Sequence, residues 1–334
     1  MTDVLIDLCA ADGVSGTEEN IAALCEQYLS RYGRAETDEF NNVICTVGEH
    51  DESKPTLLLD AHLDEIGMVV TYIDDSGFLK ASGIGLDERV LSAAQVTILG
   101  RRRLYGIVTS VPPHLQTDKK NAVSIDELYI DTGLDARSVK EIVSLGDRVL
   151  IENRLEKMGE LVTSKALDDR CCCAAVIYAL ELLKNRACAY NIKVLFSSKE
   201  ETGSQGAKTA AFKINADLAV AVDVSFAKSH SENEDYCGEI GKGAMIGFSP
   251  VLSKRLSCAL KQTAEQAGID YQIEVMSGRT GTNADVIAVS ACGVPTCTLS
   301  IPIRYMHTPV ETAAMSDVEN TGELIAQFCE RGLF

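Results

Sequence analysis

The sequence contains no tryptophan, and aromatic residues occupy only 5% of its 334 positions. Sugar-binding clefts usually rely on aromatic platforms, so this scarcity disfavours a carbohydrate-binding enzyme. Basic residues are also few, because 31 Lys and Arg are outnumbered by 49 Asp and Glu, which leaves a formal net charge of −18. Proteins that bind the phosphate backbone of nucleic acids need clustered positive charge, so we do not expect nucleic acid to be a partner.

The chain also lacks a hydrophobic run long enough to cross a bilayer, and its first residues lack the basic and apolar regions of a signal peptide. We therefore expect a cytoplasmic protein that does not bind membranes. None of the 12 cysteines form a CxxC pair, the spacing that thiolate metal sites need. In a cytoplasmic protein such cysteines are interpreted as small buried apolar side chains.

Two kinds of pattern alternate along the chain. Apolar runs at 56–60, 193–197, 218–222 and 296–301 are separated by helical patterns, which predicts an α/β fold with a mixed, mostly parallel sheet flanked by helices. Residues 67–159 instead contain short strand patterns split by turn residues, which predicts a small β-barrel or sandwich. We therefore predict a catalytic domain formed by residues 1–66 and 160–334, with a β-domain inserted at 67–159. Within the insertion, the polar and proline-led stretch 112–121 predicts a mobile loop.

Local signals predict where two of the helices begin. Ser15 with Glu18, and Ser316 with Glu319, have the spacing of a capping box. The first of these helices is predicted to extend to Gly33, where glycine would stop it.

Metal-binding residue types lie at the ends of the four apolar runs. His62 follows the first run, Glu200 and Glu201 the second, Asp223 the third, and His307 the fourth. The ends of parallel strands open onto a common crevice, so these side chains are expected to lie together. Imidazole and carboxylate groups suit zinc or cobalt, and two neighbouring ions need a carboxylate between them.

Each candidate also has an ordinary explanation when it is taken alone. Asp168 lies at the start of a predicted helix, where aspartate is a common N-cap, and His307 could be a surface histidine. The Glu200–Glu201 pair would usually be solvated, because two buried carboxylates repel each other, but beside two dications that repulsion becomes attraction. The joint occurrence of these residues predicts a metallohydrolase.

The motifs that contain these residues resemble those of the tetrahedral, or deblocking, dinuclear metallo-aminopeptidases, which include glutamyl aminopeptidases and proteins labelled cellulase M. The similar motifs are AHLDEIG at 61–67, KALDDR at 165–170, EETGSQG at 200–206 and IRYMHTP at 303–309. The resemblance extends over nearly the whole chain. It implies short peptides as substrates, a zinc-peptidase-like catalytic domain, a barrel-like or PDZ-like insertion that helps oligomerisation, and homo-oligomers from dimers to dodecamers.

Carried over residue by residue, the resemblance implies two divalent metal ions per subunit, zinc or cobalt. The ligands would be His62, Asp168, Glu201, Asp223 and His307. Asp168 would bridge the ions and would precede a cis peptide bond. Glu200 would be the catalytic base, and Asp64 would orient His62 by accepting its ring proton.

Near the expected substrate pocket the chain departs from the family pattern. The family usually has Gly-Thr-Asp-Ala there, whereas Asn283 takes the place of the aspartate in this chain. The exchange keeps the shape of the side chain and removes a charge. Arg279 and Arg304 are further candidates for substrate binding, because a pocket that prefers acidic side chains needs a basic residue. We expect a preference for acidic or aliphatic N-terminal residues.

Three other classes of protein stay open. An N-acyl amino-acid deacylase, or another dinuclear amidohydrolase, would use the same metal chemistry. A glycoside hydrolase such as an endoglucanase needs two opposed carboxylates across a sugar cleft and has no use for two histidines and a bridging aspartate. A binding protein that has lost catalysis is disfavoured, because every expected ligand position holds a competent residue type.

Overall fold

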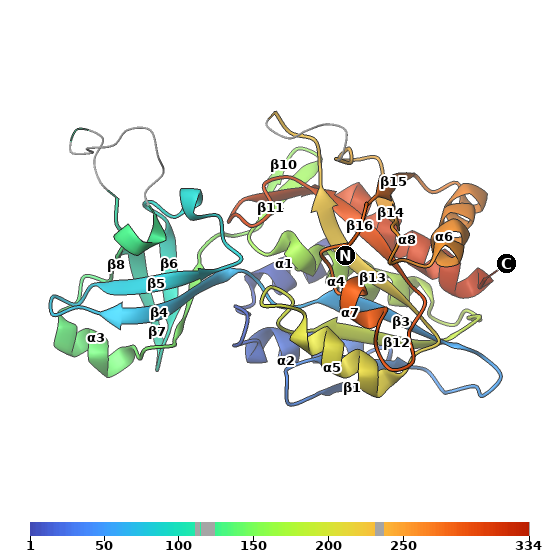
Figure 1. The fold of residues 1–334 in the computed structure, drawn as a ribbon, viewed down its shortest axis with the longest axis horizontal. Helices are drawn as coiled ribbons and strands as arrows, with labels where there is room; N and C mark the ends of the chain where they lie inside the picture. The colour runs from blue at the N-terminus through green and yellow to red at the C-terminus, as the bar shows by residue number, and fades with distance from the viewer. Residues whose placement is uncertain (111–113, 115–123, 231–236, 334) are drawn as a thin grey trace.

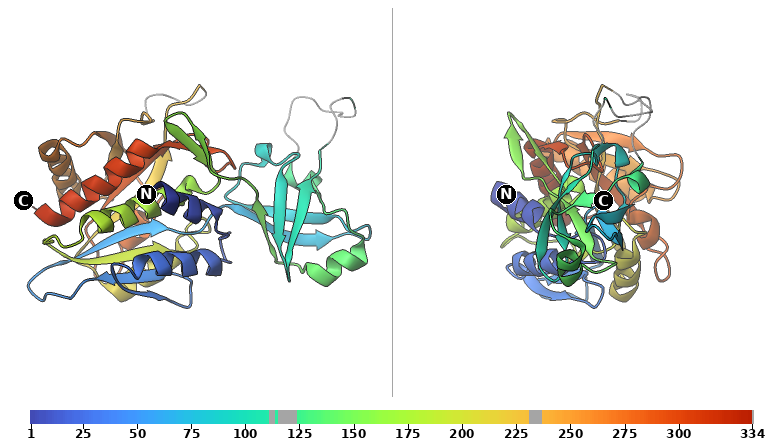
Figure 2. Two further views of the ribbon diagram at one scale, coloured as in Figure 1. Left: turned by 180° about the vertical axis from the view of Figure 1, so that it is seen from behind. Right: turned by 90° about the vertical axis from the view of Figure 1, so that its left-hand side faces the viewer.

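The computed structural model describes residues 1–110, 114, 124–230 and 237–333. An α/β body and a closed β-barrel lie side by side along the long axis of the molecule (Figure 1 and Figure 2). This arrangement confirms the predicted fold class. The predicted mobile loop at 112–121 lies outside the described residues, except for His114. Within the described part of the chain, no helix has both the length and the apolar character needed to span a bilayer.

An eight-stranded mixed sheet forms the centre of the α/β body. Its four middle strands are parallel, and they are β12 (Asn191–Ser197), β3 (Thr56–His62), β13 (Leu218–Phe226) and β16 (Thr296–Ile303). These strands are the predicted apolar runs. Helices cover the sheet on both faces, which is why the runs are continuously hydrophobic rather than alternating. The outer strands are β1 (Gly33–Thr37), β2 (Val43–Val47), β14 (Ala244–Phe248) and β15 (Tyr271–Val275).

Most helices pack on one face of this sheet. They are α1 (Thr2–Ala10), α2 (Glu19–Leu29), α4 (Leu167–Leu182), α6 (Lys254–Ala267) and α8 (Met315–Arg331). The rear view in Figure 2 shows α8 in red and the N-terminal helices in blue on this side. The other face is covered by α5 (Gln205–Ile214) and α7 (Ala284–Ile287).

Helix α4 is buried on nearly all sides, between the sheet and α8. A helix in that position must be apolar all round, which explains its run of cysteines and alanines. Gly322 of α8 marks the close approach, because a Cβ there would lie 2.8 Å from the carbonyl oxygen of Ala175. All 12 cysteines are free, and the eight that are buried confirm their interpretation as small core side chains.

The barrel has its own hydrophobic core, separate from that of the sheet. Its strands are β4 (Gly67–Ile73), β5 (Leu79–Ile84), β8 (Ile130–Asp131), β7 (Arg103–Val108), β6 (Gln95–Leu99) and β9 (Arg148–Ile151). Helix α3 (Ala136–Ile142) packs against this core. After the barrel, β10 (Glu156–Met158) and β11 (Leu161–Ser164) lead the chain back into the α/β body. They form a small sheet with β17 (Glu311–Ala314), which pairs with β11.

Both predicted capping boxes are wrong. Helix α2 begins at Glu19 and ends at Leu29, and Gly33 starts strand β1 instead of stopping the helix. The Ser15 hydroxyl is 3.1 Å from the Thr202 hydroxyl, so a tertiary contact replaces the cap. Helix α8 begins at Met315 without a side-chain cap.

Candidate metal centre

The predicted ligands meet at the edge of the sheet where the parallel strands end. His62 is the last residue of β3, Asp223 lies in β13, Glu201 follows β12, and His307 follows β16. Asp168 reaches the same place from the first turn of α4. All five residues line one cavity of about 1000 Å³. The strand ends therefore open onto a common crevice, as the sequence predicted.

The ligand atoms form two groups that share Asp168. In one group His62, Asp168 and Asp223 each offer an atom within 4.8 Å of the others, and Asp168, Glu201 and His307 form the second group in the same way. Asp168 Oδ1 lies 3.0 Å from His62 Nε2, while Asp168 Oδ2 lies 3.4 Å from His307 Nε2. His307 Nε2 is also 3.5 Å from Glu201 Oε2. One carboxylate therefore faces both groups, the arrangement that a bridging ligand requires.

The backbone around Asp168 is irregular and excludes an ordinary N-cap. The Asp168–Asp169 peptide is cis, as the resemblance implied. The N-cap position of α4 is Ala166, and neither aspartate has helical dihedral angles. Asp169 belongs to neither ligand group that contains Asp168 and accepts the backbone N–H of His62 at 3.0 Å.

Asp64 lies between His62 and the adjacent glutamates. Its carboxylate accepts the backbone N–H groups of Glu200 at 2.9 Å and Glu201 at 3.2 Å. His62 Nδ1 is 3.2 Å from the Asp64 carbonyl oxygen and 3.5 Å from Asp64 Oδ1. A proton on Nδ1 would therefore face Asp64, which leaves Nε2 of His62 directed at Asp168.

Glu311, which the sequence analysis did not single out, joins the two loops that contain Asp168 and His307. It is buried in β17 and accepts the backbone N–H of Asp168 at 3.0 Å and that of His307 at 2.9 Å. In the sequence, only its position four residues after His307 could have pointed to a role at this site. No spacing rule connects it with Asp168, which lies 143 positions away.

A second group that sequence reasoning missed is a buried ion cluster on either side of the cis peptide. Glu65 lies 2.6 Å from Lys165 Nζ and 3.5 Å from an Arg170 nitrogen. Glu65 also accepts the backbone N–H of Gly13, and Arg170 donates to the Leu8 carbonyl oxygen at 2.6 Å. Buried charges are tolerated when they are paired in this way, and the pairing fixes both ends of the segment that presents Asp168.

The barrel also contacts the centre. Gly85 has a φ of +67°, and a Cβ there would lie 2.6 Å from Glu201 Oε2 and 2.8 Å from Ile66 Cγ2. Two residues further on, the Asp87 N–H donates to the His307 carbonyl oxygen at 3.3 Å. The loop after β5 therefore contacts both Glu201 and His307, which belong to the second ligand group.

Replacing Gly85 by alanine is expected to weaken metal binding by displacing Glu201. The left-handed φ also costs any L-residue about 1–2 kcal/mol. Gly133→Ala is the matched control, because Gly133 lies in the barrel segment with a φ of +69° and no atom within 4 Å of its would-be Cβ. Metal content per chain and thermal stability should be measured for both variants. Both should lose stability, and equal metal content in the two would contradict the assigned contact.

The charges of the centre fit divalent cations. Burial, with Asp168 nearby, raises the pKa of Glu201 and of Asp223 well above their ordinary values. Burial would also raise the pKa of Asp168, but the flanking His307 and His62 lower it below its ordinary value. Glu201 Oε1 is buried, and no residue that the structure describes donates a hydrogen bond to it, as expected for an atom that binds a ligand outside the chain.

The residues predicted to bind substrate are not all at the cavity. Arg279 lines it on an exposed segment. Asn283 is buried and donates from Nδ2 to the Ser197 hydroxyl at 2.8 Å. Arg304 donates from Nε to the Lys228 carbonyl oxygen at 2.8 Å, a contact that supports the backbone. Of the three, the structure places Arg279 alone on the cavity wall.

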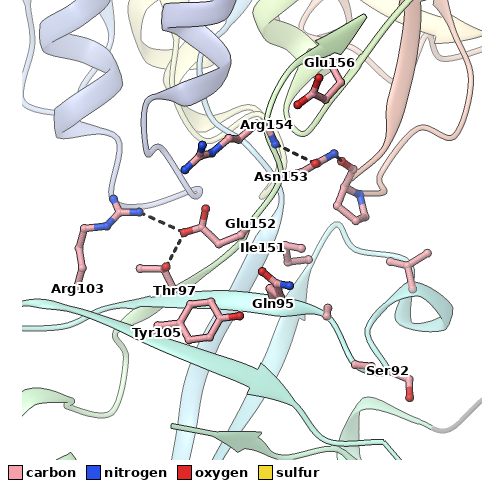
Figure 3. Close-up of a pocket in the computed structure, with 14 residues that line it drawn as sticks. Ser92, Gln95, Thr97, Arg103, Tyr105, Ile151, Glu152, Asn153, Arg154 and Glu156 are labelled. Carbon is pink, nitrogen blue, oxygen red and sulfur yellow. Dashed lines mark hydrogen bonds and ion pairs between the residues drawn. The ribbon is translucent and has the colours of Figure 1, made fainter. Parts of the chain in front are cut away.

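Two other features do not share this chemistry. A third group of potential ligand atoms, from Asp169, Cys171 and Cys172, is fully buried, and burial raises the pKa of the Cys172 thiol well above its ordinary value. A thiol that stays protonated is a poor metal ligand. A separate cavity of about 960 Å³ lies beside the barrel, where Glu152 accepts hydrogen bonds from Thr97 and Arg103 (Figure 3). None of the predicted site residues line that cavity.

The fold and the site define a hydrolase with a candidate metal centre. Residues 41–324 match the M42 glutamyl aminopeptidase family, so the chain belongs to that family of aminopeptidases. This confirms the resemblance to the tetrahedral metallo-aminopeptidases.

Individual relatives match over almost the whole chain. The sequence is 33% identical to a protein of Acetivibrio thermocellus over 98% of both chains, and 31% identical to the lysyl aminopeptidase of Pyrococcus furiosus over 98% of this chain and 96% of that protein. Among solved structures, aminopeptidase APDkam598 from Desulfurococcus kamchatkensis has a TM-score of 0.92 and 29% identity, over 99% of this chain and 94% of that one. The TET1 peptidase of Pyrococcus horikoshii has a TM-score of 0.87 and 29% identity over 99% of both chains.

Proposed function

We propose that this chain is a dinuclear metallo-aminopeptidase that removes the N-terminal residue from short peptides. The observation that carries the proposal is the position of Asp168, whose two carboxylate oxygens face two separate ligand groups. Glu200, Glu201 and Asp223 line the same cavity, so four carboxylates lie together. Two divalent ions would supply the four positive charges that balance them.

In this proposal the two ligand groups hold one zinc or cobalt ion each, with His62 and Asp223 on one side of Asp168 and Glu201 and His307 on the other. Such ions, when bound, lower the pKa of a bound water and polarise a substrate carbonyl. The remaining chemistry belongs to side chains of the chain.

Glu200 is proposed as the general base. It lines the cavity but belongs to neither ligand group. Asp64 holds its backbone, and its Oε1 accepts a hydrogen bond from the Ser204 hydroxyl at 3.1 Å. Burial raises the pKa of Glu200 above its ordinary value, toward the range that suits proton transfer near neutral pH. Glu200 accepts a proton from the attacking water and then donates it to the leaving amine.

The same charges explain a restriction to the first residue of a peptide. The free α-amine of a peptide would bind near a metal ion or a carboxylate of the centre, which places the first peptide bond beside Glu200. A blocked N-terminus lacks this amine. The preferred N-terminal side chain is a separate question, because the family description names glutamate and one close relative is named for lysine. An acidic side chain, as predicted from the sequence, would pair with Arg279, because Arg279 is the predicted basic residue that lines the cavity.

We also propose that the chain forms homo-oligomers, from dimers to dodecamers, with residues 67–159 as an assembly domain and 1–66 with 160–334 as the catalytic domain. The TET1 peptidase of Pyrococcus horikoshii can assemble into a tetrahedron or a large octahedral shell, which supports this proposal. Light scattering coupled to size-exclusion chromatography tests it. A mass of 36.0 kDa in solution would be that of one chain and would contradict assembly.

The decisive test of function compares free and N-acetylated peptides with the metal-loaded protein. Hydrolysis of free aminoacyl chromogenic substrates, with the acetylated forms left intact, is the expected result. A preference for the acetylated forms would identify a deacylase instead. Release of reducing sugar from cellulose that survives complete metal removal would identify a glycoside hydrolase.

Metal binding is expected to strengthen as pH rises. Because burial raises the pKa of Glu201 and of Asp223, both carboxyls of the metal-free protein keep protons at pH values where free acids are ionised. A metal ion must displace these protons. The apparent Kd for cobalt should therefore fall with rising pH, by up to about tenfold per pH unit for each proton released. Titrations at several pH values from acidic to mildly basic measure this, and a constant Kd would contradict it.

A further inference from the structure

The cavity contains one carboxylate that the proposed mechanism does not use. Glu274 in β15 lines the same cavity as the ligand groups. It accepts hydrogen bonds from the Ser225 hydroxyl at 2.5 Å and the Ser300 hydroxyl at 3.0 Å, one on each carboxylate oxygen. Both oxygens are therefore held, and the carboxylate is directed across the sheet toward β13 and β16.

The two serines place this carboxylate close to the first ligand group. Ser225 follows Asp223 by two residues in β13, so their side chains share one face about 6.6 Å apart along the strand. Ser300 is the register partner of Asp223 in β16. Strand β14 lies between β15 and β16, so the Glu274 side chain reaches across β14 to Ser300.

The cavity that Glu274 lines also has apolar side chains. Met245, Met276 and Phe226 line the cavity with it. Methionine side chains adapt to flexible aliphatic chains because they are unbranched and polarisable. Apolar side chains and a held carboxylate in one cavity match a side chain with an aliphatic stem and a terminal cation, as in lysine and arginine.

Glu274 lacks a counterion within the described part of the chain. Its hydrogen-bond partners are two neutral hydroxyls, and burial raises its pKa despite them. Glu274 is partly buried, so its carboxylate loses part of its hydration, and binding a cation would offset that cost. Arg279 shares the cavity but lies on its exposed edge.

We propose that Glu274 selects peptides whose N-terminal residue is lysine or arginine, by binding the terminal cation of that side chain. The inference rests on the proposed aminopeptidase function and replaces the acidic or aliphatic preference expected from the sequence with a basic one. The α-amine stays at the metal centre, while the side chain extends along β13 toward Ser225 and Glu274.

The test compares lysyl and norleucyl p-nitroanilides, because norleucine keeps the aliphatic stem and lacks the ammonium group. For the metal-loaded protein, kcat/KM should be roughly 10- to 100-fold higher for the lysyl substrate, the range expected for a hydrogen bond to a charged group. Glu274→Gln should remove this ratio and leave norleucyl hydrolysis in place. Glu265→Gln is the matched control, because Glu265 lies on the surface of α6 and bonds to Lys261 and Tyr271.

The outcomes separate this inference from the function on which it rests. A preference for glutamyl substrates, or a lysyl-to-norleucyl ratio that Glu274→Gln leaves intact, would overturn the role of Glu274 while aminopeptidase activity stands. Loss of that ratio in Arg279→Gln alone would overturn it too. Failure to hydrolyse any unblocked substrate would instead reject the proposed function. Competitive inhibition by free L-lysine, stronger than that by L-norleucine, gives a readout that does not depend on turnover of the lysyl substrate.

A second variant covers the case in which Glu274→Gln does not fold. Glu274→Asp keeps the charge and withdraws it by one methylene, so selection should shift from lysyl toward the longer arginyl substrate. An unchanged ratio of arginyl to lysyl hydrolysis would contradict the proposed contact.

Discussion

Replacing Glu200 by glutamine is expected to lower kcat by about 10²- to 10⁴-fold, the usual contribution of a general base, while metal content stays at the wild-type level. Glutamine has the same shape and can keep the contact with Ser204, but it cannot accept a proton from water. The structure separates Glu200 from both ligand groups, which is why metal binding should survive. Steady-state kinetics and metal analysis on the same preparation measure the two effects.

Glu201→Gln is the matched control for this prediction, because the same change is made one residue along the chain. Glu201 belongs to the group with Asp168 and His307, and its Oε1 has no hydrogen-bond partner among the described residues. Its substitution should lower metal occupancy first and activity as a consequence. Near-normal turnover by Glu200→Gln would discard its role as the base.

Substitution of Asp168 by alanine is expected to remove both metal ions, whereas His307→Ala should remove one. Asp168 is the residue common to both ligand groups, so its loss leaves each group with two members. His307 belongs to one group, and the group of His62, Asp168 and Asp223 remains intact without it. Metal content per chain after dialysis should therefore fall from two to none in the first variant and to one in the second.

Asp217→Asn provides the control for these metal measurements. Asp217 is an exposed aspartate that accepts the backbone N–H of Thr56 at 2.7 Å, at the start of β3 and so at the opposite end of the strand from His62. This variant should keep both ions. If Asp168→Ala also kept two ions, the bridging role would be wrong, and unchanged occupancy in His307→Ala would exclude His307 as a ligand.

Much of the architecture could be predicted because its signals are local. A parallel strand buried on both faces must be apolar along its whole length, so β3, β12, β13 and β16 appear in the sequence as continuous runs. Their ends are then the places where polar side chains can gather. Helix starts were less predictable, because the Ser15 hydroxyl contacts Thr202 from a distant loop instead of capping α2.

The roles of the outer residues could not be predicted in the same way. Glu311 holds Asp168 through the backbone, and Gly85 approaches Glu201 from the loop after β5 of the barrel. In the sequence Glu274 is indistinguishable from an ordinary polar residue of an edge strand. Only the fold brings Ser225 and Ser300, from two other strands, into contact with it. Each of these contacts joins segments far apart in the chain, and sequence spacing has no rule for such pairs.

The sequence by itself determined the chemical types of the candidate ligands and, for all but Asp168, their places at strand ends, because buried parallel strands and metal-binding side chains leave a local pattern. The tertiary structure alone decided which carboxylate faces both ligand groups, which residues hold the loops of Asp168 and His307, and which further acid lines the same cavity. These depend on distances between side chains from different strands, and only the folded sheet brings those side chains together.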